Sequence, residues 1–260
     1  MTYLAYRTSG VNLSGRARPL LLASVREPGE ARAALDAGVD LLDVKEPRHG
    51  SLGPVDPEIL RAIVALRDAR AEGQPPARTP VSVALGDAPD PPSTTALAAL
   101  AAACGADYLK IGLRGIRHAS EAIDRLRSIV AAARAASPSV RIVAAAFADD
   151  DPAGSLPVLD LPAVAASGGA SGCLIDTLRK DGGALPDRLG IETLAAFATA
   201  CRERGMLSAL AGSIGIAHLP RLLAIGPDLI GTRGALCGGG RDGALDPALV
   251  IAFRDALRAA

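Results

Sequence analysis

Lysine is the side chain with which this sequence could do covalent chemistry, and the chain contains only three. Its 28 basic residues are 25 arginines together with Lys45, Lys110 and Lys180. Arginine serves wherever only a positive charge is needed, but it neither loses its proton near neutrality nor forms an imine with a carbonyl compound. The three lysines are therefore candidates for carbonyl chemistry, and their chance survival in an arginine-rich chain is the alternative.

Carboxylates stand close in sequence to two of these lysines. Asp43 and Lys45 are two residues apart in the apolar run LLDVK, and in a β-strand this spacing places both side chains on one face. By the same alternation Lys110 points inward in the run YLKIGL, where its apolar neighbours take the opposite face. Asp176 ends the run GCLID, and Lys180 follows it on the next loop. All five residues thus belong to strand ends or to the loops directly after them.

A repeating alternation of strands and helices must position these residues. Short apolar runs with β-strand character occupy residues 20–25, 41–45, 81–87, 108–113, 141–149, 172–177, 207–213 and 229–236. Amphipathic or Ala/Leu-rich helical patterns lie between them, at 28–37, 57–71, 94–104, 119–136, 160–167, 191–204, 216–225 and 246–258. Eight such units predict an α/β fold, a single (β/α)8 TIM barrel over residues 19–260 after an N-terminal extension at 1–18. An open doubly wound sheet is disfavoured because no GxGxxG turn follows the first strand.

Active sites of (β/α)8 barrels lie at the carboxyl ends of the strands. Five candidate catalytic residues are therefore expected to converge on one mouth: Asp43, Lys45, Lys110, Asp176 and Lys180. A free lysine has a pKa of about 10.4 and is almost fully protonated at pH 7, but burial and neighbouring ammonium groups lower that pKa. Such an amine is a nucleophile for carbonyl carbons, and the carboxylates offer general acid–base catalysis. Structural ion pairs inside the barrel are the alternative.

The last two strand–helix loops contain residues suited to a phosphate group. They read ALAGSIG (209–215) and IGTRGAL (230–236). Many barrels bind phosphate with the loops after strands seven and eight and with a helix N-terminus. We expect backbone N–H groups, one hydroxyl and one guanidinium to contact a phosphate, from Gly212, Ser213, Arg233, Gly234 and Ala235. Ordinary glycine-rich turns are the alternative.

Composition argues against several other classes of function. Aromatic residues make up 2% of the chain, tryptophan is absent and the formal net charge is zero, so the stacking platforms and basic surfaces of nucleic-acid-binding proteins are missing. No apolar run is long enough to span a membrane, and the first residues do not resemble a signal peptide. Four scattered cysteines favour reduced thiols. We therefore expect a cytoplasmic protein with no nucleic-acid or membrane partner.

No metal site is expected from the sequence. The three histidines lack the spacing of metal ligands, and they are His49, His118 and His218. His118 and His218 are expected on the surface. The acidic run 149–151 could hold magnesium, but a solvated loop or a helix cap is the favoured interpretation.

With these motifs, the sequence resembles the (5-formylfuran-3-yl)methyl phosphate synthase family, also called the 4-(hydroxymethyl)-2-furancarboxaldehyde-phosphate synthase family. The matching stretches follow one another from about residue 20 onward: DVKEPRHGSLG (43–53), VALGD (83–87), GADYLKIGL (105–113), LIDTLRKDGG (174–183), LAGSI (210–214) and GTRGALC (231–237). The chain departs from the archaeal pattern in its N-terminal extension and at Glu46, where archaeal members commonly have asparagine. Neither difference removes a required group.

The resemblance implies a lyase that condenses two molecules of glyceraldehyde 3-phosphate into a phosphorylated furan aldehyde, early in methanofuran-type cofactor biosynthesis. It implies that Lys45 forms the Schiff base, without a metal or organic cofactor, and that the other catalytic residues are Asp43, Lys110, Asp176 and Lys180. Triose phosphates are the expected partners, and a homo-oligomer is the expected assembly. The alternatives are another class I sugar-phosphate aldolase, or a barrel that binds pyridoxal phosphate without turnover.

Overall fold

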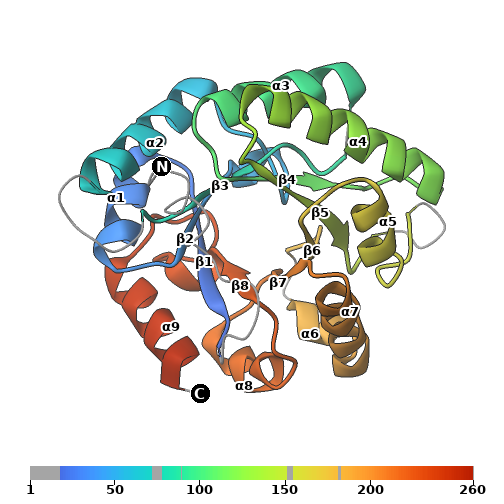
Figure 1. Ribbon diagram of the computed structural model, residues 1–260. Helices are drawn as coiled ribbons and strands as arrows, with labels where there is room; N and C mark the ends of the chain where they lie inside the picture. The colour runs from blue at the N-terminus through green and yellow to red at the C-terminus, as the bar shows by residue number, and fades with distance from the viewer. Residues whose placement is uncertain (1–17, 72–77, 89, 151–154, 181–182, 260) are drawn as a thin grey trace, which may run out of the picture.

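A closed barrel of parallel strands forms the centre of the protein, whose computed structural model describes residues 18–71, 78–88, 90–150, 155–180 and 183–259 (Figure 1). Each strand pairs with the next one along the chain, and β8 pairs with β1. The strands are β1 Leu20–Val25, β2 Leu41–Val44, β3 Val81–Ala84, β4 Tyr108–Gly112, β5 Arg141–Phe147, β6 Gly172–Asp176, β7 Leu207–Leu210 and β8 Leu229–Thr232. The predicted (β/α)8 barrel is confirmed.

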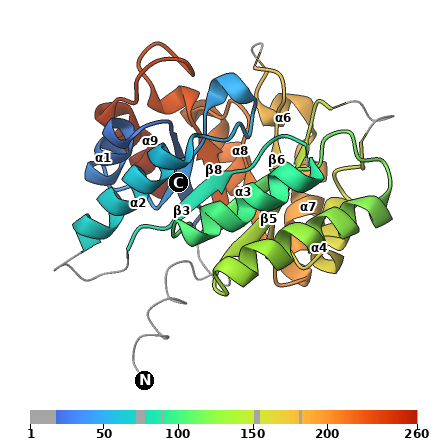
Figure 2. The same cartoon turned by 90° about the horizontal axis from the view of Figure 1, so that it is seen from above.

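Helices surround the strands on the outside of the barrel (Figure 1). They are α1 Pro28–Asp36, α2 Pro57–Ala71, α3 Pro91–Ala103, α4 Ala119–Ala136, α5 Leu161–Ser167, α6 Leu185–Arg188, α7 Ile191–Glu203, α8 Leu219–Leu223 and α9 Pro247–Ala259. Short 3-10 helices also lie in the described loops, namely η1 Pro47–His49, η2 Ile216–His218 and η3 Gly234–Leu236. The side view shows α3 and α4 side by side along one flank (Figure 2). Because the strands are parallel, their carboxyl ends all open on one side.

Local sequence explains where many of these helices begin. Proline stands in the first turn of α1, α3, α5, α6 and α8, where its missing N–H costs no helical hydrogen bond. After α1 the chain turns at Gly38, whose φ of 74° is a left-handed conformation that glycine adopts without strain. These signals mark the starts of five helices and the end of α1.

Strand side chains alternate between two apolar layers. Leu42 faces outward and packs in the layer between strands and helices. Leu41 and Tyr108 face inward and help to fill the barrel interior. The residues two positions further along, Asp43 and Lys110, therefore also point inward, above the interior apolar layer. The inward direction predicted for both polar side chains is confirmed, since both line the same interior cavity.

Several strands end earlier than the apolar runs indicate. β3, β7 and β8 stop at Ala84, Leu210 and Thr232, although the runs continue to residues 87, 213 and 236. At Gly212 and Ser213 the φ angles are 112° and 51°, which are incompatible with a strand. The surplus residues belong to the strand–helix loops, although the first of them after β3 and β7, Leu85 and Ala211, still donate backbone hydrogen bonds to Lys110 and Ile175 of the neighbouring strands. The short helix α6 is an element that the sequence analysis did not include.

The predicted N-terminal extension, residues 1–18, lies outside the described residues except for Arg18, which is exposed. Within the described part of the chain, no helix combines the length and the apolar character needed to cross a bilayer.

Candidate active site

A cavity of about 400 Å³ opens at the carboxyl ends of the strands. This volume falls in the range of small-molecule binding sites. Its lining includes all ten residues that the sequence analysis selected, which are Asp43, Lys45, Lys110, Asp176, Lys180, Gly212, Ser213, Arg233, Gly234 and Ala235. The structure therefore brings the three lysines, two carboxylates and both glycine-containing loops to one site.

Asp43 and Lys110 form a buried ion pair inside the barrel. The Nζ atom of Lys110 lies 2.7 Å from Oδ1 of Asp43, and the side chains are 5% and 1% exposed. Ser24 on β1, which is in register with Asp43, donates its hydroxyl to the other carboxylate oxygen at 3.0 Å. Both partners are thus held in fixed positions, and the pair can exchange a proton with a ligand in the cavity.

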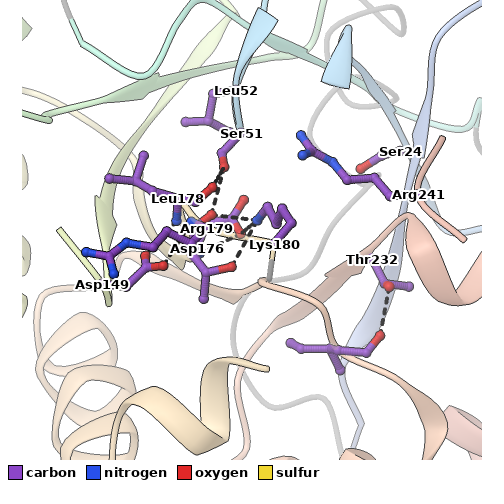
Figure 3. Close-up of polar contacts among 12 residues, drawn as sticks. Ser24, Ser51, Leu52, Asp149, Asp176, Leu178, Arg179, Lys180, Thr232 and Arg241 are labelled. Carbon is purple, nitrogen blue, oxygen red and sulfur yellow. Dashed lines mark hydrogen bonds and ion pairs between the residues drawn. The ribbon is translucent and has the colours of Figure 1, made fainter. Parts of the chain in front are cut away.

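A second ion pair joins Asp176, at the end of β6, to Lys180 on the following loop (Figure 3). Nζ of Lys180 lies 2.9 Å from Oδ1 of Asp176 and also donates to the carbonyl and hydroxyl of Thr177. These contacts fold the loop back, so that Lys180 reaches the cavity. Burial alone would raise the pKa of Asp176, but the charges of Lys180 and Lys45 and two hydrogen bonds lower the pKa overall. Asp176 is therefore ionised near neutral pH.

Lys45 lies one residue beyond β2 and is 7% exposed. Its Nζ atom donates a hydrogen bond to the carbonyl of Ser51 at 3.0 Å, and among the described residues no carboxylate forms a salt bridge with it. Burial lowers the pKa of Lys45 to about 8; the carboxylates of the two ion pairs oppose this shift, and their ammonium groups add to it. A neutral amine is consequently available at this position near neutral pH.

Ser51 ties the loop after β2 to two other loops of the site (Figure 3). Asp87, after β3, accepts the backbone N–H groups of Ser51 and Leu52 at 3.0 and 2.7 Å. The Ser51 hydroxyl donates to the carbonyl of Thr177 at 2.7 Å, while the Ser51 carbonyl holds Lys45. Ser51 and Asp87 are positioning residues that the sequence analysis did not select. The sequence signal that could have identified them is that Ser51 lies in the motif GSLG and Asp87 in the motif VALGD.

Asp149, the first residue of the acidic run 149–151, holds the loop after β6 in place. Asp149 accepts the backbone N–H groups of Leu178 and Arg179 at 2.6 and 2.9 Å (Figure 3). Leu178 and Arg179 lie in a loop, so Asp149 is not a helix cap, and Asp151 lies outside the described residues. Over the part of the chain that the structure describes, no three His, Cys, Asp or Glu side chains group together in a way that could hold a metal ion.

The loops after β7 and β8 border the cavity mainly with backbone groups. Ser213 is the one non-glycine residue with a positive φ among the described residues, a conformation that stores strain and is frequent at functional sites. At position 212 a Cβ atom would lie 2.7 Å from Cγ2 of Thr177, so glycine is required there. Thr232 donates its hydroxyl to the carbonyl of Ile214 at 2.8 Å and joins the two loops (Figure 3). These loops can present neutral donors to a phosphate.

One histidine lies at the site, contrary to the sequence-based expectation. His218 lines the cavity, because η2 folds over the loop after β7. Its Nδ1 atom accepts the backbone N–H of Gly215 at 2.9 Å. His118 is exposed, as expected.

Arg233 requires a correction of its predicted role. It borders the cavity, but Nε donates to the carbonyl of Arg241, and the two terminal nitrogens donate to Glu30 and to the carbonyls of Ser24 and Gly243, at 2.7 to 3.1 Å. A guanidinium has five N–H groups, and these five contacts use all of them. Arg233 therefore supports the loop after β8 and has no donor left for a phosphate.

The Arg233–Glu30 pair leads to a prediction about stability. Its side chains are 3% and 4% exposed, so Glu30→Gln would leave a buried guanidinium without its counter-charge. We expect a loss of about 3–5 kcal/mol in the free energy of unfolding, measured by chemical denaturation. The control is Glu121→Gln, which removes an exposed pair with Arg125 and should change stability by about 0.5 kcal/mol or less. Equal stability of the two variants would contradict the structural role of Arg233.

Fold and site together define a (β/α)8 barrel with a lysine-centred cavity at its strand ends. Residues 21–254 match the 4-HFC-P synthase family, and the chain belongs to this family. Its relatives include the (5-formylfuran-3-yl)methyl phosphate synthase of Methanothermobacter thermautotrophicus, 42% identical over 222 residues (85% of this chain, 90% of the relative). The protein of the same name from Methanocaldococcus jannaschii is 38% identical over 239 residues (91% of this chain, 98% of the relative). The resemblance stated from the motifs is confirmed.

Solved structures support the fold. KGPDC from Streptococcus mutans superposes with a TM-score of 0.62 at 15% identity and covers 93% of this chain and 98% of its own. Phosphoribosyl anthranilate isomerase from Thermus thermophilus gives a TM-score of 0.60 at 16% identity and covers 92% and 98%. At these identities the likeness concerns the architecture alone.

Proposed function

We propose that this enzyme condenses two molecules of glyceraldehyde 3-phosphate into (5-formylfuran-3-yl)methyl phosphate through a Schiff base on Lys45. The observation that carries the proposal is the buried Lys45 amine, with a pKa of about 8, in one cavity with two Lys–Asp ion pairs. The names of the relatives support the identity of the product. The proposed setting is methanofuran-type cofactor biosynthesis in the cytoplasm.

The first half of the proposed reaction makes one carbon–carbon bond. One triose phosphate is enolised and reprotonated to a ketone resembling dihydroxyacetone phosphate, with the Lys–Asp pairs removing and returning the protons. The neutral Lys45 amine attacks a carbonyl carbon, and loss of water gives an imine. Loss of a neighbouring proton then leaves a carbanion that the imine stabilises, and this carbanion adds to the aldehyde carbon of the second triose phosphate.

The second half removes one phosphate and closes the ring. Elimination of phosphate breaks a carbon–oxygen bond, hydrolysis frees Lys45, and ring closure with dehydration forms the furan. Two triose phosphates thereby give one furan phosphate, one phosphate and two waters, so the atoms balance without an oxidant or a reductant. The proposed reaction is a lyase reaction, and it invokes no metal or organic cofactor.

Incubation of the purified enzyme with glyceraldehyde 3-phosphate alone tests this function. We expect a product with the mass of the furan phosphate and with the near-ultraviolet absorbance of a furan aldehyde. A non-absorbing sugar phosphate would instead identify another class I aldolase. A yellow protein that binds pyridoxal phosphate and forms neither product would identify a binding barrel.

The lowered pKa of Lys45 predicts how activity depends on pH. Only the neutral amine attacks, and with a pKa of about 8 about one amine in ten is neutral at pH 7. We expect kcat/KM to rise with pH until the pH exceeds about 8, and to fall by about tenfold per pH unit in acid. Initial rates measured from about pH 6 to pH 9 check this. Rates that are flat across this range, or that fall as the pH rises, would contradict a role for the neutral amine.

A further inference from the structure

Two triose phosphates would bring two phosphate dianions into the cavity, which therefore needs fixed positive charge. Five cationic side chains line the cavity: Lys45, Lys110, Lys180, Arg233 and Arg241. Three of them are neutralised by carboxylates, in the pairs Asp43–Lys110, Asp176–Lys180 and Glu30–Arg233. Lys45 must give up its charge to react. Among the residues that the structure describes, the fixed charge that is left on the cavity wall belongs to Arg241.

Arg241 is held by carbonyl groups and, among the described residues, by no carboxylate. Its Nη2 atom donates to the carbonyls of Pro47 and Gly50 at 3.0 and 2.9 Å. These neutral acceptors leave the guanidinium charge uncompensated and do not use Nη1 or Nε. In Figure 3 the side chain extends from the loop after β8 across the mouth towards Ser51. Within the described part of the chain, Nη1 and Nε of this partly buried guanidinium have no hydrogen-bond acceptor, and such a group on a cavity wall is suited to bind an oxyanion through two N–H groups at once.

We propose that Arg241 binds the phosphate group of one triose phosphate at the edge of the cavity between β8 and β2. The neutral donors around Gly212–Ser213 and Gly234–Ala235 bind the phosphate of the other molecule. The identity of the ligand in this inference rests on the proposed function. The position of the phosphate rests on the contacts of Arg233 and Arg241.

The backbone of the loop that carries Arg241 is held in place by two other arginine side chains. Arg233 donates to the backbone carbonyls of Arg241 and Gly243 at 2.7 and 3.0 Å, and Arg26 donates to the carbonyl of Asp242 at 3.3 Å. The buried arginine thus fixes the backbone from which the second arginine reaches the cavity. Arg233 thus supports the loop, while Arg241, eight residues further along the chain, is left to bind the phosphate.

The same contacts connect phosphate binding to the reactive amine. Arg241 donates to Pro47 and Gly50, and the next residue, Ser51, accepts the hydrogen bond from Lys45. A phosphate on Arg241 therefore lies beside the loop that orients Lys45. This arrangement favours imine formation with phosphorylated carbonyl compounds over unphosphorylated ones.

Titration with inorganic phosphate, followed by phosphorus NMR, tests the proposal without turnover. Arg241→Gln keeps N–H groups for the loop carbonyls but removes the charge, and it should weaken phosphate binding at one of the two proposed positions by about 10- to 100-fold. Arg241→Lys keeps a positive charge but lacks the paired N–H donors of a guanidinium, and it should recover part of the affinity for phosphate. The control is Arg134→Gln, an exposed arginine on α4 that likewise donates to a backbone carbonyl, and it should bind as the wild type does.

Borohydride trapping of Lys45 gives a second readout. Arg241→Gln should lose trapping by glyceraldehyde 3-phosphate by about 10-fold or more, but keep trapping by unphosphorylated glyceraldehyde. Wild-type phosphate affinity in Arg241→Gln, or an equal loss in the Lys and Gln variants, would overturn the proposal. Failure to form a furan would refute the proposed function and leave the phosphate titration valid, so the two failures are distinguishable.

Discussion

Replacing Lys45 with arginine is expected to lower furan formation from glyceraldehyde 3-phosphate by roughly 10⁴-fold or more. Arginine keeps the positive charge and much of the volume of lysine, but it cannot form an imine. The loss would therefore report the covalent step and not the electrostatics of the cavity. The measurement is the rate of the near-ultraviolet absorbance increase, with circular dichroism to show that the variant is folded.

A conservative exchange elsewhere provides the control for this variant. Arg134→Lys makes the reverse exchange on the exposed face of α4, where the side chain donates to the carbonyl of Gly169, and it should leave the rate unchanged. If Lys45→Arg retained activity within about tenfold of the wild type, the covalent role of Lys45 would be refuted. Catalysis would then have to be assigned to one of the two paired lysines.

The second large effect is expected at Lys110 and Lys180. Each donates to a buried carboxylate, Asp43 or Asp176, and the proposed steps require these pairs to move protons. Lys110→Arg and Lys180→Arg keep the ion pairs but cannot exchange protons near neutrality. We expect kcat to fall by about 10²- to 10⁴-fold while KM changes by less than about tenfold. Steady-state kinetics on both variants, at the pH optimum of the wild type, give this comparison.

Imine formation at Lys45 distinguishes a proton-transfer role of Lys110 and Lys180 from a purely structural role. Lys110→Arg and Lys180→Arg should still be trapped at Lys45 by borohydride, because the amine itself is intact. Full activity in either variant would remove that lysine from the proton-transfer scheme and leave a simpler one-lysine site. A variant that is folded but cannot be trapped would show that its main role is to position Lys45.

Alternation along the strands made the centre of the site predictable. An apolar residue on each side of Asp43 and of Lys110 allows one orientation in a barrel that is packed on both faces, and the structure has that orientation. The position of Lys180 depended on more than periodicity. Its loop turns back because Thr177 and Asp176 accept hydrogen bonds from its amine, and these contacts have no signature in the spacing.

Partners that are distant in sequence account for what the sequence analysis missed. Glu30 is 203 residues away from Arg233, and nothing in either segment indicates that they pair and withdraw the guanidinium from the cavity. The hydrogen bond from the Ser51 backbone N–H to Asp87 joins two loops whose residues are 36 positions apart in the sequence. Periodicity reports which face a side chain takes, but it does not report which loop folds over which.

The covalent role of Lys45 is tested by identifying the residue that forms the imine. The enzyme is incubated with glyceraldehyde 3-phosphate, reduced with borohydride and digested, and the modified peptide is sequenced by mass spectrometry. We expect one reduced triose-phosphate adduct, on Lys45, that is absent when substrate or borohydride is omitted. An adduct on Lys110 or Lys180 instead, or a wild-type enzyme that forms the furan without any trapped lysine, would contradict the covalent role of Lys45.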